Sequence, residues 1–163
     1  MWPYKVIDNF LSDIDFMLIT DNMLRIKAND KVERQFFHYD PTPQIADLLK
    51  EFPKRRKYTS LEKFIHYAVT PANFTHKVHD EAPFKIMSAV LYLHPEENYG
   101  TKLYHNDEIV DVEWKPNRLM VFCGETGVTW HDYKASTMRY TYNYFLVDPA
   151  QIENVEYKKH AIK

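Results

Sequence analysis

The stretch RYTYNYFLV, residues 139–147, alternates polar and aromatic side chains in the manner of a β-strand. In an extended chain its three tyrosines point to one side. The other side carries Arg139, Thr141, Asn143 and Phe145. Two interpretations are open. In one, the tyrosines fill the core and the polar set faces water. In the other, the polar set lines an enclosed pocket, where the Arg139 guanidinium can bind a carboxylate through two parallel hydrogen bonds.

Several other segments have the same strand-like character. They are short, rich in β-branched and aromatic residues, and separated by turn-forming residues such as the PEEN stretch at 95–98. These segments are residues 63–69, 84–93, 108–114, 117–123 and 128–133. Many short strands joined by tight turns predict an antiparallel sandwich or small barrel. We therefore expect a mainly β fold with flanking helices.

Two helices are expected ahead of these strands. Residues 12–24 begin with Ser12, a residue that caps helix N-termini well, and apolar residues then recur at roughly helical spacing. Residues 42–52 open with Thr42 just before a proline, and Pro53 closes the segment.

The length of the chain fits a single domain. It has 163 residues, enough to bury a core, and contains no internal repeat or evident linker. We expect a helical front (1–60), a β core (61–148) and a tail (149–163).

The composition is that of a soluble cytoplasmic protein. The net charge of −2 gives no global attraction to nucleic acid, and the basic run at 54–57 is better explained as a solvated turn after a helix. The single cysteine, Cys123, can form no internal disulfide, which suits a reducing compartment. The polar start is unlike a signal peptide, and no apolar stretch reaches membrane-spanning length. We expect no nucleic-acid or membrane partner; the oligomeric state is open.

The segment THKVHDE, residues 75–81, contains candidate metal ligands. If it is extended, His79 and Glu81 lie on one side. Asp80 and His76 then point the other way, so the two histidines cannot bind one ion from a regular strand. An imidazole and a carboxylate two residues apart on a strand can reach one metal ion, and they require a third ligand.

His131 is the candidate for that third ligand, because it lies in the strand-like segment 128–133. Two histidines and one carboxylate on a β scaffold form the facial triad that binds Fe(II) in non-haem oxygenases. Isolated histidines are more often structural than metal-binding, so an explanation without a metal is also open at this point.

From about residue 60 to 148 the chain resembles the 2-oxoglutarate/Fe(II)-dependent dioxygenases, specifically the prolyl 4-hydroxylase-like branch. These proteins have a double-stranded β-helix, or jelly-roll, core. The matching segments follow the family's order, and the opening VIDNFLS (6–12) is also similar to that of many members. They are HYAVTPANFTHKVHDE (66–81), SAVLYLHPEENYGTKLY (88–104), WKPNRLMVFCGETGVTWHDY (114–133) and RYTYNYFLVD (139–148).

The resemblance implies a role for each candidate residue. His79, Glu81 and His131 would hold Fe(II). The distal carboxylate of 2-oxoglutarate would be bound by Arg139, helped by Tyr92, Tyr67 and either Thr141 or Asn143. O2 would be the other co-substrate, and ascorbate an accessory reductant.

Two positions depart from the family pattern. The carboxylate ligand would be Glu81 rather than the commoner aspartate, which keeps the neighbouring Asp80 as an alternative ligand. His76 stands where many relatives have an aromatic residue.

The implied activity is hydroxylation of a small-molecule or peptide substrate. The branch favours a free or peptidyl amino-acid side chain, proline first, although this is an analogy of fold. One rival is a non-catalytic β-barrel module that binds a metal or a carboxylate without turnover. Another is a structural protein in which the three ligand candidates are ordinary polar residues. Compact members also resemble proteins common in bacteriophage genomes, which is compatible with a phage-encoded protein.

Overall fold

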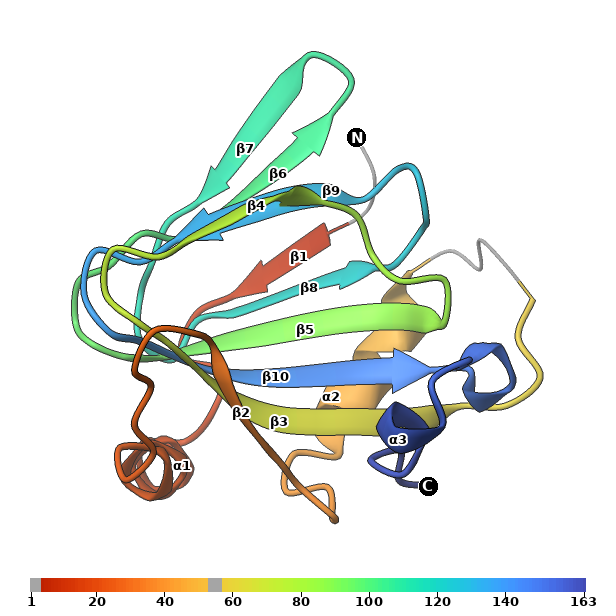
Figure 1. The fold of residues 1–163 in the computed structure, drawn as a ribbon, viewed down its shortest axis with the longest axis horizontal. Helices are drawn as coiled ribbons and strands as arrows, with labels where there is room; N and C mark the ends of the chain where they lie inside the picture. Colours follow the sequence, from red (N-terminus) through yellow and green to blue (C-terminus); the bar gives the residue numbers. More distant parts are fainter. Residues whose placement is uncertain (1–3, 53–56) are drawn as a thin grey trace.

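The structure is a computed structural model that describes residues 4–52 and 57–163. In this part of the chain, two antiparallel sheets face each other (Figure 1). The larger sheet runs in the order β1 (Tyr4–Ile7), β8 (Leu119–Cys123), β5 (Lys85–His94), β10 (Arg139–Val147), β3 (Glu62–Thr70) and β2 (Glu33–Phe36). The smaller sheet runs β4 (Thr75–His79), β9 (Trp130–Lys134), β6 (Thr101–His105) and β7 (Glu108–Val112). The predicted mainly β fold is confirmed.

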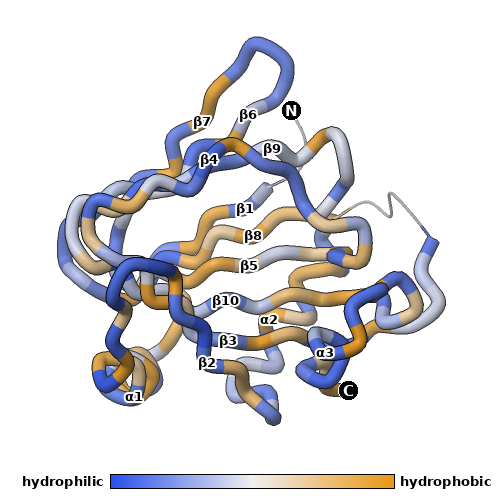
Figure 2. Tube along the Cα trace, viewed as in Figure 1, coloured by the Kyte–Doolittle hydropathy of each residue, from blue (hydrophilic) through white to orange (hydrophobic). Residues whose placement is uncertain are grey.

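The strand β10 lies in the middle of the larger sheet, between β5 and β3. Its tyrosines lie on the outer face: Tyr142 and Tyr144 are fully buried in a core that also contains Met23 and Ile45. The opposite face of β10 looks into the space between the two sheets. The larger sheet is the more apolar of the two, and the loop between β6 and β7 is hydrophilic (Figure 2). The alternation in 139–147 therefore separates a packed face from a pocket face.

The first predicted helix is confirmed as α1 (Asp13–Met23). The Ser12 hydroxyl accepts a hydrogen bond from the Asp15 backbone N–H at 3.2 Å, which satisfies one of the free donors at the helix start.

The second predicted helix is shorter and starts differently. It consists of α2 (Gln44–Asp47) and a 3-10 turn, η1 (Leu48–Glu51). Thr42 does not cap it, because the cap position is taken by Pro43; the Thr42 hydroxyl lies 2.7 Å from the Tyr142 hydroxyl instead. That bond ties the segment to the outer face of the larger sheet. The predicted stop, Pro53, lies outside the described residues, as do residues 54–56 of the basic run.

The front of the chain is not purely helical, which corrects the expectation for residues 1–60. β1 pairs with β8 and β2 pairs with β3, so both edges of the larger sheet come from this part of the chain. The two strands have only four residues each, too few for a clear alternation pattern.

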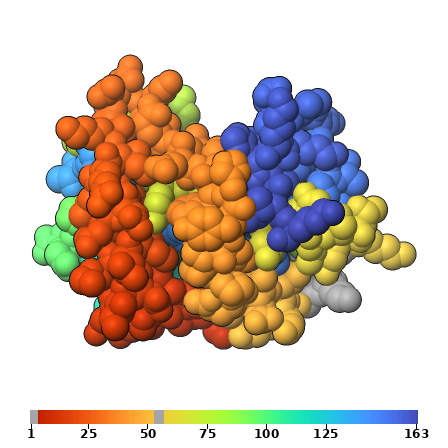
Figure 3. Space-filling view, turned by 90° about the horizontal axis from the view of Figure 1, so that it is seen from below, coloured from red at the N-terminus to blue at the C-terminus, as the bar shows by residue number. Residues whose placement is uncertain are grey.

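The C-terminal tail folds back onto the start of β3. It contains η2 (Pro149–Gln151) and α3 (Val155–Lys158), and Ile162 pairs with Lys63 through two backbone hydrogen bonds. Seen from below, the segments from α1 to η1 (red to orange) and this tail (dark blue) lie on the same face (Figure 3). No helix of the described residues is long and apolar enough to span a membrane.

Candidate metal and co-substrate site

A pocket of about 460 Å³ lies between the two sheets. The larger sheet contributes the inward face of β10, together with His66 and Ala68 from β3 and Arg34 from β2. The smaller sheet contributes histidines from β4 and β9. Of the predicted site residues, the pocket brings together His79, Glu81, His131, Arg139, Thr141 and Asn143. The interpretation that places the polar side of residues 139–147 in water is therefore wrong.

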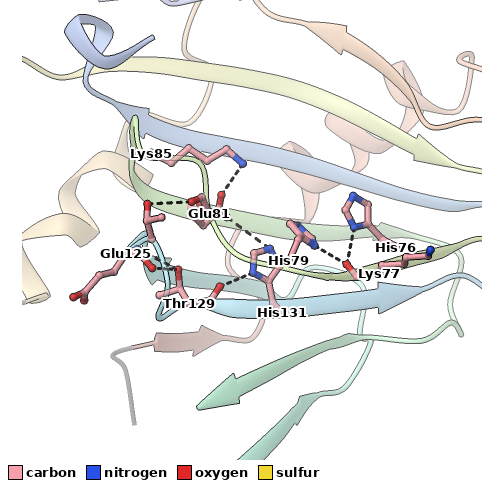
Figure 4. A network of polar contacts seen from close by, with 10 residues as sticks. His76, Lys77, His79, Glu81, Lys85, Glu125, Thr129 and His131 are labelled. Carbon is pink, nitrogen blue, oxygen red and sulfur yellow. Dashed lines mark hydrogen bonds and ion pairs between the residues drawn. The ribbon is translucent and has the colours of Figure 1, made fainter. Parts of the chain in front are cut away.

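His79 and His131 face each other across the β4–β9 pair, with ring centroids 4.2 Å apart. Each ring is held by a backbone carbonyl: Nδ1 of His79 lies 2.9 Å from the Lys77 oxygen, and Nδ1 of His131 lies 2.9 Å from the Thr129 oxygen (Figure 4). When Nδ1 carries the proton and donates it, Nε2 presents a lone pair. Burial lowers the pKa of both imidazoles, which favours the neutral form that can bind a metal.

Glu81 supplies a buried carboxylate beside these rings. One oxygen accepts a hydrogen bond from the Ser88 hydroxyl at 2.7 Å, and the other forms an ion pair with Lys85 at 2.7 Å. The first oxygen also lies 3.7 Å from Nε2 of His131. Burial by itself would raise the pKa of Glu81, but Lys85, His131 and Ser88 together lower that pKa to about 2. The carboxylate is therefore ionised at neutral pH.

Asp80 does not share this position. Its carboxylate accepts a hydrogen bond from the Gly127 backbone N–H at 2.5 Å, in the turn between β8 and β9. The side chain thus holds a loop, while Glu81 faces the pocket, as the alternation predicts.

The donor set suits a divalent metal, although it is not arranged around one. Within the described residues, no group of three His, Cys, Asp or Glu side chains could hold a metal ion as it stands. Both oxygens of Glu81 are engaged, one by Lys85 and one by Ser88. The Lys85 ammonium supplies the positive charge that a bound cation would bring. Two neutral imidazoles and one carboxylate match Fe(II) in chemistry, provided that Glu81 exchanges its partners.

Arg139 is buried at another part of the pocket, with only 3% of its surface exposed. One terminal nitrogen reaches the Thr101 hydroxyl at 3.4 Å, and the guanidinium carbon lies 4.3 Å from the centre of the Tyr133 ring. Its Nε is buried and has no hydrogen-bond partner among the described residues. A buried guanidinium with an unsatisfied donor is costly unless an anion binds it. Arg139 is therefore suited to a carboxylate.

Tyr92 lies beside this guanidinium. Its ring centre is 5.4 Å from the Arg139 guanidinium carbon, and its ring stacks on Trp114 with centroids 4.6 Å apart. The Tyr92 hydroxyl donates to the Thr101 hydroxyl at 2.8 Å. Tyr92 thus packs against Arg139 and shares Thr101 with it, but does not itself line the pocket.

Tyr67 lies on the wrong face for a co-substrate contact, which corrects that prediction. Its hydroxyl donates to the Ile19 backbone oxygen at 3.0 Å, and its ring packs against Phe37 in the outer core. Side chains alternate along β3, so the neighbours His66 and Ala68 face the pocket instead. His66 lies in register with Asn143 and lines the pocket.

His76 is a pocket residue that the alternation argument excluded. The pairing of β4 with β9 shifts register between His76 and His79, so the strand is not regular there. The two rings consequently come together, with centroids 4.1 Å apart, and both line the pocket. A bulge of this kind changes which side chains share a face, and nothing in the residues 75–81 marks it.

Comparison with known proteins identifies this two-sheet arrangement. No family model and no curated protein sequence matches the chain. Among solved structures, a prolyl hydroxylase from Trichoplax adhaerens, in complex with a fragment of hypoxia-inducible factor, superposes with a TM-score of 0.72 at 16% identity, over 91% of this chain and 84% of that one. This chain has the prolyl hydroxylase fold.

Two further structures with this fold show the same likeness. A prolyl-4-hydroxylase from Pseudomonas putida gives a TM-score of 0.68 at 16% identity, over 90% of this chain and 93% of that one. A viral collagen prolyl hydroxylase from Paramecium bursaria Chlorella virus-1, in complex with 2-oxoglutarate, gives 0.64 at 15% identity, over 88% and 94%. The predicted jelly-roll core of the 2-oxoglutarate oxygenases is confirmed as the fold of this chain.

Proposed function

We propose that the protein is a 2-oxoglutarate- and Fe(II)-dependent dioxygenase that hydroxylates its substrate. His79, Glu81 and His131 would hold Fe(II), and Arg139 would bind the distal carboxylate of 2-oxoglutarate. The observation that carries the proposal is the unsatisfied Nε of Arg139, buried in the same pocket as the three metal-ligand candidates. The prolyl hydroxylase fold supports it, because oxygenases of that fold use this cofactor pair.

Each residue has a definite task in this proposal. The carbonyl oxygens of Lys77 and Thr129 orient the two imidazoles so that Nε2 faces the metal position. Thr141 and Asn143 line the same face of β10 as Arg139 and offer polar groups to the co-substrate. With Fe(II), 2-oxoglutarate and O2 bound, the centre would supply oxidative decarboxylation to succinate and CO2, coupled to hydroxylation of a substrate C–H bond. Ascorbate would keep the iron reduced.

The substrate would be an amino-acid side chain, free or within a peptide, with proline as the first candidate. The three similar structures named above are prolyl hydroxylases, and the one from Trichoplax adhaerens has a peptide fragment bound. No distinction between free and peptidyl substrates follows from those likenesses.

The test is anaerobic addition of Fe(II) and 2-oxoglutarate to the metal-free protein. A visible metal-to-ligand charge-transfer band should appear in the wild type. It should be lost in His79→Ala and His131→Ala, and retained in the control His38→Ala, which changes an exposed histidine that does not line the pocket. Arg139→Gln should weaken 2-oxoglutarate binding by about tenfold to a hundredfold, as expected for the loss of a charged hydrogen-bond donor.

Two results would contradict the proposal. A wild-type protein without the band would not be an iron and 2-oxoglutarate enzyme. A band without any succinate release, over a panel of amino acids and prolyl peptides, would instead indicate a non-catalytic binding module.

A further inference from the structure

Arg34 is a second arginine that lines the pocket; it lies on the edge strand β2, where its side chain is also exposed to solvent. In the β2–β3 register it pairs with Ala68, and both side chains line the pocket. The neighbours of Arg34 along the strand, Glu33 and Gln35, pair with Val69 and Tyr67, which belong to the outer core. Arg34 therefore points to the same side of the sheet as the metal-ligand candidates.

A small residue lies beside Arg34 on the inner face of the sheet. Ala68 lies between Arg34 on β2 and Thr141 on β10, because it pairs with both. The methyl group of Ala68 is the smallest side chain among these three neighbours, between a guanidinium and a hydroxyl. Phe36 and His66, packed with ring centroids 5.1 Å apart, form the adjoining wall. Across the three strands, Arg34 thus supplies a positive charge, Ala68 a small side chain and Thr141 a polar group, next to an apolar wall.

Arg34 and Arg139 cannot serve one small dicarboxylate together with the metal position. Their strands, β2 and β10, are separated by β3, which puts them about 10 Å apart across the sheet. The register also offsets them along the strands, since Arg139 pairs with Thr70 and Arg34 with Ala68. If 2-oxoglutarate extends from the metal position to Arg139, Arg34 is left to face the substrate.

The charges of the pocket point to an anion at Arg34. Among the described residues that line the pocket, Glu81 is the one acid, and Lys85 already pairs with it. Arg34 forms no ion pair with another described residue. Burial, and next Arg34 itself, lower the pKa of His66 to about 3, so this imidazole is neutral and adds no charge. The positive charge of Arg34 thus has no acidic counterpart within the described lining.

We propose that Arg34 binds the carboxylate of a small substrate, so that the molecule hydroxylated here is a free amino acid. A residue inside a peptide has no such carboxylate on its backbone. This inference rests on the proposed function, because it assigns Arg139 to 2-oxoglutarate. Arg34 is a specificity-determining residue in this account.

The experiment compares acids with their amides on the protein loaded anaerobically with Fe(II) and 2-oxoglutarate. The protein L-amino acids and their carboxamides are titrated, and a blocked prolyl peptide is included. Binding is followed by the shift of the charge-transfer band and, independently, by calorimetry. At least one amino acid should bind, and its carboxamide should bind about tenfold to a hundredfold more weakly, as expected for a lost charged hydrogen bond.

The Arg34 variants locate the effect. Arg34→Gln should weaken binding of the amino acid by the same factor and leave the affinity for the carboxamide unchanged. Arg34→Lys should recover part of the lost affinity. Arg25→Gln makes the same change at a position that is exposed, as Arg34 is, but lies outside the pocket, and it should bind like the wild type. All these variants should retain the charge-transfer band.

The outcomes separate the two proposals. The inference is overturned if no amino acid binds, if acid and amide bind equally, if Arg34→Gln has no effect, or if the blocked peptide binds most tightly. Each of those results can occur with the band intact, which leaves the proposed function standing. If the wild type shows no charge-transfer band, the proposed function itself is contradicted.

Discussion

Glu81 is a buried carboxylate that stays charged because Lys85 lies against it. The two side chains are 2.7 Å apart, and Lys85 also lies 4.0 Å from the centre of the Phe145 ring. A buried carboxylate without such a partner would be protonated or strongly destabilising. The pair therefore keeps the candidate ligand ionised in the metal-free protein. Under the proposed function, a bound metal ion would replace Lys85 as the source of positive charge.

The pH dependence of stability should reveal this ionised carboxylate. The pKa of Glu81 falls from 4.5 to about 2 on folding, so its stabilising contribution is present above about pH 4.5 and is lost as the pH falls toward 2. Between those limits the free energy of unfolding of the wild type should drop, relative to Glu81→Gln, by about 3 kcal/mol. Urea unfolding of both proteins over this pH range measures the difference.

Equal pH dependence of the two proteins would show that Glu81 is not held in its ionised form. The Glu81→Gln substitution also removes the ion pair with Lys85, which changes stability at every pH. The test therefore uses how the difference in unfolding free energy between the two proteins varies with pH, and not the size of that difference at one pH.

The sequence predicts well which side chains face the pocket where a regular strand carries them. Arg139, Thr141 and Asn143 share the pocket face that the alternation allows. The prediction for Tyr67 rests on the resemblance alone, and Tyr67 lies on the outer face. An alignment error of one residue along a strand is enough to assign a side chain to the wrong face. The ion pair of Glu81 with Lys85 crosses a turn between β4 and β5, and the spacing in sequence gives no sign of it.

At the scale of elements, irregular backbone is what sequence patterns miss. The register shift in β4 brings His76 beside His79, and the alternation rule holds only without such a shift. Turns follow a recognisable chemistry here in spite of only three glycines. Left-handed backbone occurs at Asn9, Asn73, Asn106 and Asn117, and asparagine tolerates this conformation better than most residues. Asparagine thus takes turn positions that glycine often fills.

Substitutions on the two faces of β10 should have different effects: one on the outer face should lower stability, and one on the pocket face should weaken 2-oxoglutarate binding. Tyr142→Phe removes the hydroxyl that meets Thr42 at 2.7 Å in the outer core, and should cost about 1 to 2 kcal/mol of stability. It should leave 2-oxoglutarate affinity unchanged, because the ring faces away from the pocket. Thr141→Val, the preceding residue, keeps the size of its side chain and should weaken 2-oxoglutarate binding with little loss of stability. Urea unfolding and calorimetry measure the two effects.

The opposite pattern would be decisive against the assigned faces. A Tyr142→Phe protein with normal stability and impaired binding would mean that the outer face of β10 takes part in the site.

At the scale of the whole molecule, the fold places chemistry from distant parts of the chain in one pocket. The smaller sheet carries His76, His79 and His131, the larger sheet carries the two arginines, and the front of the chain supplies Arg34 through an edge strand. Identity of 12–16% to the similar structures is compatible with a TM-score of up to 0.72, because a jelly roll requires alternation, turns and volume more than particular residues. The mainly β, antiparallel architecture was therefore predictable from the pattern of short strands, and the jelly-roll core from the family resemblance. The short edge strands were not.

The most direct test of the central claim is a crystal structure of the protein prepared anaerobically with Fe(II) and 2-oxoglutarate. The account predicts one metal ion bonded to Nε2 of His79, Nε2 of His131 and the Glu81 carboxylate, with Lys85 moved off that carboxylate. It also predicts the distal carboxylate of 2-oxoglutarate on Arg139, with Nε among its donors. A metal bound elsewhere, or an Arg139 that makes no contact with 2-oxoglutarate, would contradict it.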